Sequence, residues 1–410
     1  MIRVCDAIMG SGKSRAAMTY MNEHPERRYI YITPYLQEAA RIRKGCPRLR
    51  FVEPSDKIKE YGYRKTAHTA ALISKGANIT TTHQAFSKYT NDMLEDIRKY
   101  RYVLVIDENV EVIHRFAFNL EDLQIAISAG IVEERDGVCR LGETSYNGAC
   151  FSGLVSQLRT GELIRVGDSR VGDLFYWEMP IDLFTAFEDV VILTYMFDGQ
   201  SLHHFLRMYN LDVNHIGVRQ DSDGVYRFCD DTHIRPAYVS RLNDMVRIYD
   251  GDSMNLVGRG RNALSVGWFQ RGGENVDILR RNVYNYYHNI HADAKSNEIL
   301  WSTYNQYYNT LKGKGFTRGY LAFNAKATNE YRNRDCLAYL VNLFVPVGEK
   351  MLYQERGVEI NEDRYALSTM VQWIWRSAIR DGRPVDLYVP SERMRTLLRG
   401  WINTVAERGC

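Results

Sequence analysis

A glycine-rich segment near the N-terminus contains the residue types that hold a nucleotide phosphate. It reads DAIMGSGKSR and fits the phosphate-loop pattern, with Ala7 where the commonest form has its first glycine. Gly10 and Gly12 let backbone N–H groups turn toward a phosphate, Lys13 reaches the β and γ phosphates, and the Ser14 hydroxyl ligates Mg2+. We therefore predict that ATP and Mg2+ bind here, with contacts from Ala7, Met9, Gly10, Ser11, Gly12, Lys13, Ser14 and Arg15.

Two adjacent acids follow a continuous apolar run farther along the chain. Residues 102–109 read YVLVIDEN, which is typical of a buried parallel strand that ends in a Walker B site. Asp107 would hold Mg2+ through water, and Glu108 would orient or deprotonate the attacking water. An acidic pair can also simply cap the next helix, but a phosphate loop upstream favours the catalytic interpretation.

A basic segment lies near the C-terminus. It reads VQWIWRSAIRDGR, and Gln372, Arg376, Arg380 and Arg383 recur at spacings of four, four and three residues. On a helix these side chains would share one face. A solvated basic stripe is the simpler interpretation, whereas a complete NTP site upstream favours an arginine-finger helix from a second domain.

The composition of the chain indicates its size class, its charge and its cellular environment. The chain has 410 residues, of which 45% are hydrophobic and 25% charged, and this predicts a soluble protein of about two domains. A formal net charge of +3 makes any nucleic-acid surface local. Seven scattered cysteines and the lack of a long apolar run predict a reducing, cytoplasmic location without a membrane.

The ordered segments AIMGSGKS, ITP, TTHQ, IDEN, LTY and QWIWRSAIR resemble the motifs of superfamily 2 (DEAD/DEAH-like) helicases and translocases. The resemblance spans nearly the whole chain and is strongest to compact helicases of tailed bacteriophages, with YLAFNAKATNEYRNRD as the fifth motif. In the sixth motif Trp375 replaces a glycine, and the last arginine, Arg380, lies one residue later than usual. The second motif reads D-E-N-V, which fits neither named branch, and no adenine-reading motif is expected before the phosphate loop.

The resemblance implies an α/β fold of two RecA-like domains with parallel central sheets and the NTP site in the cleft between them. The first domain would supply Lys13, Ser14, Asp107 and Glu108, and the second would supply Gln372, Arg376 and Arg380.

Domain limits follow from the same pattern. We expect the first domain over residues 1–215, with an inserted hairpin or subdomain at about 110–180, and a linker or hairpin over 216–240. The second domain would span 241–410. Its predicted strands are Met245–Tyr249, Ile299–Ser302, Gly319–Phe323 and Val385–Val389.

Two groups of residues are candidates for contact with a nucleic acid. The first group is the basic residues of a glycine-rich loop, which could bind phosphates. The second group is implied by the helicase resemblance and lies at the ends of predicted strands and in the fifth motif. The full set is Thr33, Pro34, Thr82, His83, Lys312, Lys314, Arg318, Thr328 and Asn329.

Together these features predict an ATP-dependent helicase or translocase that acts on DNA, single-stranded or forked, in phage replication or recombination. Phage replication proteins would be its partners, in the cytoplasm of the infected bacterium. A viral DNA-packaging ATPase is an alternative, but it would normally carry a nuclease domain with clustered acids. An ATP-switched clamp without unwinding is a second alternative, against which Glu108 beside Asp107 argues.

Overall fold

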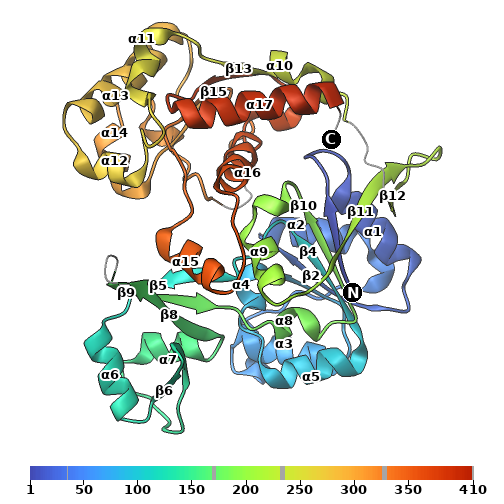
Figure 1. Cartoon of the computed structure of the whole chain (residues 1–410). Coiled ribbons are helices and arrows are strands. Elements are labelled where there is room, and N and C mark those ends of the chain that lie inside the picture. Colours follow the sequence, from blue (N-terminus) through green and yellow to red (C-terminus); the bar gives the residue numbers. More distant parts are fainter. Residues whose placement is uncertain (35, 169–171, 231–235, 326–329, 409–410) are drawn as a thin grey trace. The chain divides into compact units, whose positions relative to one another are not determined.

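The computed structural model describes residues 1–34, 36–168, 172–230, 236–325 and 330–408. The chain forms two compact units (Figure 1). The first comprises Met1–Ala7, Gly12–Thr232 and Pro346–Ile360, and the second comprises Ile8–Ser11, His233–Val345 and Asn361–Cys410. The chain therefore returns to the first unit once after most of the second has been built.

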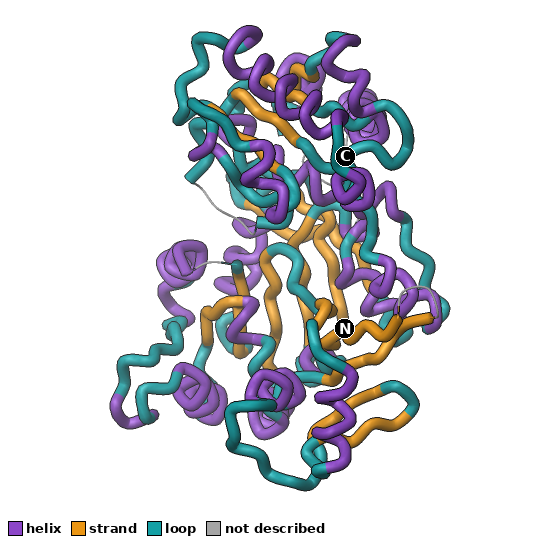
Figure 2. The backbone as a smooth tube through the Cα atoms, turned by 90° about the vertical axis from the view of Figure 1, so that its left-hand side faces the viewer, coloured by secondary structure: helices purple, strands orange, loops and turns teal. Residues whose placement is uncertain are grey.

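A seven-stranded sheet organises the first unit, in the order β12-β11-β1-β10-β4-β2-β3. All neighbouring strands are parallel except β11 and β12. The central strands are nearly continuous apolar runs because helices cover both faces of the sheet (Figure 2). The strands are β1 (Ile2–Asp6), β2 (Arg28–Thr33), β3 (Ile79–Thr82), β4 (Tyr102–Asp107), β10 (Asp189–Thr194), β11 (Val213–Gln220) and β12 (Tyr226–Cys229).

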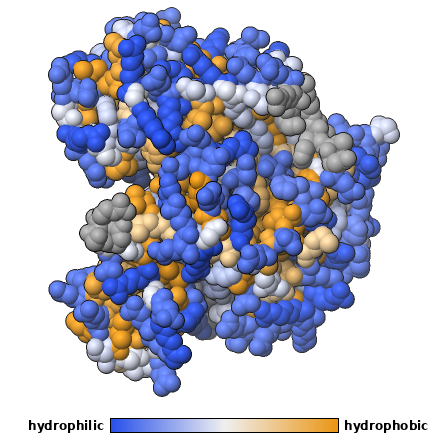
Figure 3. All heavy atoms as spheres, in the orientation of Figure 1, coloured by the Kyte–Doolittle hydropathy of each residue, from blue (hydrophilic) through white to orange (hydrophobic). Residues whose placement is uncertain are grey.

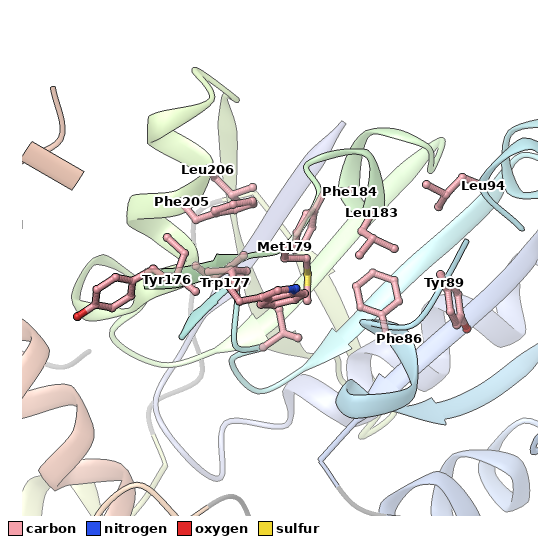
Figure 4. Packing of buried hydrophobic residues seen from close by; sticks show 14 of the residues in the cluster. Phe86, Tyr89, Leu94, Tyr176, Trp177, Met179, Leu183, Phe184, Phe205 and Leu206 are labelled. Atoms are coloured by element: carbon pink, nitrogen blue, oxygen red, sulfur yellow. The ribbon is translucent and has the colours of Figure 1, made fainter. Parts of the chain in front are cut away.

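The helices around this sheet bury one apolar face each. In α5, for example, Met93, Leu94 and Ile97 are buried at helical spacing. Phe86, Phe184 and Phe205 come from three different helices and pack in the shared core, Phe86 edge to face on Phe184 and Phe205 tilted against it (Figure 4). These helices are α1 (Lys13–Glu23), α2 (Leu36–Gly45), α3 (Lys65–Ser74), α4 (His83–Phe86), α5 (Asn91–Tyr100), α8 (Asp182–Thr185) and α9 (Ser201–Met208).

An antiparallel subdomain lies between β4 and β10, within the segment for which an insert was predicted. Its five strands follow the order β5-β9-β8-β7-β6. The returning helix α15 (Val347–Glu355) packs on β5 and β8. The other elements are β5 (Ile113–Phe116), α6 (Leu120–Ser128), β6 (Val132–Arg135), β7 (Val138–Leu141), α7 (Ser152–Leu158), β8 (Glu162–Asp168) and β9 (Gly172–Glu178).

The second unit contains a four-stranded parallel sheet in the order β13-β16-β15-β14. Its strands are β13 (Val246–Ile248), β14 (Ile299–Ser302), β15 (Cys336–Tyr339) and β16 (Val385–Tyr388). Its helices are α10 (Leu242–Met245), α11 (Asp252–Asn255), α12 (Val266–Arg271), α13 (Glu274–Asn285), α14 (Tyr308–Leu311), α16 (Glu362–Ile374) and α17 (Glu392–Arg408).

The predicted strand at Gly319–Phe323 is wrong. Gly319 ends a 3-10 turn that begins at Thr317, and Tyr320 forms only an isolated bridge to Trp301. A side chain at position 319 would come within 2.5 Å of the Ile299 carbonyl, so the chain approaches the first residue of β14 closely at this glycine. The fourth strand of the sheet is β15 instead.

The face of the molecule shown in Figure 3 is mostly hydrophilic, with apolar residues scattered between the charged ones. Among the described residues, no helix combines the length and the apolar character needed to cross a membrane.

Candidate nucleotide-binding site

The predicted catalytic residues of the first unit lie at one edge of the seven-stranded sheet. In the strand register, Asp6 at the end of β1 pairs with Thr194 of β10. Leu193 of β10 pairs with Asp107 of β4. Thr33 and Thr82 are paired at the ends of β2 and β3. Because the carboxyl ends of parallel strands meet at this edge, it is where open α/β sheets bind their ligands.

The phosphate loop connects β1 to α1 in a conformation that requires glycine. Gly10 and Gly12 have φ angles of 81° and 93°, in the left-handed region. The Ser11 hydroxyl is buried and, within the described part of the chain, has no hydrogen-bond partner. A buried hydroxyl in such a loop fits a site that accepts phosphate, whose oxygens would satisfy it.

Lys13 and Ser14 are the first two residues of α1. The Lys13 ammonium group donates a hydrogen bond to the Ala7 carbonyl within the loop. Burial lowers the pKa of Lys13, while the negative charges near it, those of Asp107 and Glu108 among them, raise it. The lysine thus faces the acids of the second motif across the strand ends and can compensate phosphate charge there.

A tyrosine that the sequence analysis did not select holds Asp107. The Tyr31 hydroxyl, on a fully buried side chain of β2, donates a 2.9 Å hydrogen bond to Asp107 Oδ2. Burial, followed by repulsion from Glu108, raises the pKa of Asp107 to about 6, and the Tyr31 hydrogen bond opposes that rise. His83 Nε2 lies 2.9 Å from the Asp107 carbonyl oxygen and donates to it. This partly buried carboxylate is the kind of hard oxygen ligand that Mg2+ prefers.

Glu108 has a φ angle of 66°, which is uncommon for a residue with a side chain. Its backbone N–H donates a 3.0 Å hydrogen bond to the Leu193 carbonyl, so the chain turns immediately after Asp107. Left-handed backbone at a non-glycine residue costs about 1 kcal/mol or more and clusters at functional sites. The conformation places Glu108 at the same sheet edge as Lys13.

A cavity of about 150 Å3 lies beside the end of β3. It contains two lysines, Lys65 and Lys88, together with several hydroxyl and amide side chains. The buried Tyr89 hydroxyl, which also lines it, has no hydrogen-bond partner among the described residues. The other lining residues are Thr66, Thr69, Thr82, Gln84, Ala85 and Met93.

The predicted residues at the ends of β2 and β3 have different environments. Thr33 is buried, and its hydroxyl has no hydrogen-bond partner within the described residues, whereas Pro34 is half-buried. Thr82 caps α4 by accepting a hydrogen bond from the Ala85 N–H and also lines the cavity. His83 is buried. Only Thr82 of these four therefore lines the cavity.

The expected arginine-finger helix is shorter than predicted. Helix α16 ends at Ile374, so Gln372, Arg376 and Arg380 do not share one helix face, and that prediction is wrong. The Ser377 hydroxyl donates to the Ile374 carbonyl, and the extended backbone of Ser377 closes the helix. Arg376 is buried in the turn, and Arg380 is exposed on a 3-10 turn.

The predicted basic loop of the second unit is exposed. Lys312 and Lys314 lie between α14 and the Thr317–Gly319 turn, which contains Arg318, and the Lys312 ammonium lies over the Tyr308 ring. Thr328 and Asn329 lie outside the described residues. Because Gln372, Arg376 and Arg380 also belong to the second unit, their approach to the nucleotide of the first remains a prediction.

Comparison with solved structures defines the class of fold. The structure of S. tokodaii Xpd4 is similar over 98% of this chain and 94% of that chain, at 12% identity and a TM-score of 0.50. An apo XPD structure is similar over 97% of this chain and 95% of that chain, at 12% identity and a TM-score of 0.49. The fold is similar to that of Xpd4, and the predicted α/β class with parallel sheets is confirmed.

Sequence comparison shows the family. Residues 240–402 match the YonV C-terminal Rossmann-like domain. Over 410 residues the chain is 34% identical to the SPbeta prophage-derived uncharacterized protein YonV of Bacillus subtilis (strain 168), and the match covers 98% of both chains. The chain therefore belongs to the YonV family.

Proposed function

We propose that this protein is an ATP-driven helicase or translocase that moves on DNA in phage replication or recombination. The observation that carries the proposal is the convergence of the phosphate loop, Asp107 and Glu108 at the carboxyl edge of one sheet. A helicase-like fold and a prophage-derived relative support it.

The site has the groups that ATP hydrolysis requires. The N–H groups of the glycine-rich loop and the start of α1 would bind the phosphates, with Lys13 near the β and γ groups. Ser14 and Asp107 would hold Mg2+, which supplies positive charge to the phosphates when it is bound. Glu108 would accept a proton from the water that attacks the γ phosphorus, and ADP and phosphate would leave.

Arg376 and Arg380 would complete the site from the second unit. A guanidinium near the γ phosphate stabilises the charge that spreads over its oxygens in the transition state. Arg380 is the better candidate, because it is exposed, whereas Arg376 is buried within its own unit.

The cavity beside β3 supports binding to a phosphodiester backbone. Lys65 and Lys88 provide charge, and Thr82 and Tyr89 are among the hydroxyl side chains that provide short-range donors. Such contacts position a nucleic acid without reading its sequence. Lys65→Gln together with Lys88→Gln should weaken single-stranded DNA binding and reduce the slope of log affinity against log salt by about 1–2.

A control double variant distinguishes DNA binding in this cavity from a general effect of positive charge on the surface. Lys44→Gln with Lys75→Gln removes the same charge from exposed positions of the first unit and serves as the control. Equal loss of DNA affinity and equal salt slopes in both double variants would contradict a role for the cavity.

The test of the function is ATP turnover without nucleic acid and with single-stranded DNA, duplex DNA or RNA. We expect strong stimulation by DNA, and loss of turnover in Lys13→Ala and Arg380→Ala. Turnover that no polymer changes would contradict the motor and favour a packaging ATPase that needs a partner. Nucleic-acid binding that responds to ATP without turnover would favour the switched clamp.

A further inference from the structure

The β11–β12 hairpin extends past the edge of the sheet at which the nucleotide would bind. Val213–Ile216 of β11 pair with β1, and Gly217–Gln220 continue beyond the last paired residue, with Tyr226 of β12 opposite Gln220. At about 3.3 Å per residue, these four further residues carry the hairpin roughly 13 Å past that point. Figure 1 shows β12 beside α1, the helix that follows the phosphate loop.

Tyr226 packs directly on the phosphate loop. A Cβ atom added to Gly12 would lie 2.1 Å from Cδ1 of the Tyr226 ring, so the ring covers the glycine itself. The Arg15 guanidinium carbon, one helical position after Ser14, is 5.3 Å from the centre of the same ring. Tyr226 is half-buried and Arg15 is exposed. An aromatic ring and a guanidinium thus lie together beside the phosphate loop.

The chemistry of this pair fits a flat, uncharged ligand group. Phosphates at the start of α1 would place the ribose, and after it the base, just outside the loop. Nucleobases stack on aromatic rings and on guanidinium planes, and any base offers such a face. Neither side chain forms the paired donor and acceptor pattern that would distinguish adenine from guanine.

We propose that Arg15 and Tyr226 hold the base of the bound nucleoside triphosphate by stacking, with little discrimination between ATP and GTP. This inference rests on the proposed function, since it takes the loop to be an NTP site. It adds a base site to the phosphate contacts.

The rest of the hairpin keeps Tyr226 in place. Arg227 Nε donates a 2.9 Å hydrogen bond to Glu23 near the end of α1, and the Phe228 ring lies 6.0 Å from that of Tyr20. Phe228→Leu therefore removes an aromatic ring from the same strand and the same helix contact, but two residues away from Tyr226. It is the matched control for loosening the hairpin.

The experiment measures dissociation constants for ATP and for inorganic tripolyphosphate, which has the phosphates but no base. We expect the wild type to bind ATP more tightly. Tyr226→Leu should weaken ATP by about tenfold, equivalent to about 1.4 kcal/mol at 25 °C, and leave tripolyphosphate unchanged. Tyr226→Phe, which keeps the ring, and Phe228→Leu should bind ATP as the wild type does.

Other outcomes overturn the inference in distinguishable ways. Equal weakening of both ligands by Tyr226→Leu would show that the ring only supports the loop, and wild-type protein that binds both ligands equally would show that no base site exists. In either case the proposed ATP site would survive. A wild type that binds neither ligand would overturn the proposed function along with the base site.

Discussion

Replacing the Asp107 carboxylate with an amide should stabilise the protein without nucleotide, although it should abolish activity. The carboxyl lies at the end of β4, beneath the Tyr31 hydroxyl and beside Glu108. An asparagine at this position can still accept the hydrogen bond from Tyr31. Asp107→Asn therefore removes a charge that is costly to bury and keeps the contact.

The magnitude follows from the pKa of Asp107, which burial raises from 3.8 to about 6. Each pKa unit corresponds to about 1.4 kcal/mol, which gives about 3 kcal/mol, and the partial exposure of the side chain reduces this to about 2 kcal/mol. Because the folded-state pKa is raised, the wild type loses this stability as pH rises from about 4 through 6. The variant should not lose it.

The assay is thermal unfolding in EDTA at pH 4.5 and pH 8. For a unit of this size, 2 kcal/mol should raise the Tm of Asp107→Asn above that of the wild type by about 6 °C at pH 8, and by about half as much at pH 4.5, where the wild type has lost only part of this stability. Asp56→Asn, an equal charge change at an exposed bend, should leave Tm unchanged at both values. A variant no more stable than the wild type at pH 8, or equally stabilised at both pH values, would refute the reasoning.

Three further substitutions probe the same unit. Gly12→Ala should lower stability by at least about 1 kcal/mol and impair ATP binding, because Gly12 has left-handed backbone and an aromatic ring against it; calorimetric titration would show undiminished affinity if this is mistaken. Tyr31→Phe removes the hydrogen bond that favours ionised Asp107, so the acid limb of kcat/KM for ATP should move up by about 1 pH unit, and an unmoved limb would count against the contact. Arg356→Met leaves the buried Glu178 carboxylate without its cation at 3.1 Å and should cost about 3 kcal/mol in urea unfolding, whereas a loss below 1 kcal/mol would mean that water reaches the pair.

The sequence indicates the local structure of the phosphate loop and of the acidic strand end well, because each is a short contiguous segment. A phosphate loop and a strand that ends in two acids each contain strand, turn and functional residues within about ten positions, so local rules suffice. Asp107 and Glu108 lie at the strand end where the apolar run stops, as that pattern predicts.

The contacts between distant segments could not be read from spacing. Tyr31 and Asp107 are separated by 76 residues, and only the pairing of β2 with β4 brings them together. Helix α16 ends at Ile374, where the Ser377 hydroxyl bonds back to the last helical carbonyl, and the 100° periodicity of the arginines does not reveal this end. The cavity around Lys65 and Lys88 depends in the same way on α3 packing near β3.

The most direct test of the motor is displacement of streptavidin from the end of a biotinylated single-stranded DNA. We predict that the wild type removes streptavidin from one end of the strand in the presence of ATP, and that Glu108→Gln, which can bind ATP but lacks the base, does not. Displacement that fails at both ends, even though DNA stimulates ATP hydrolysis, would contradict directional movement.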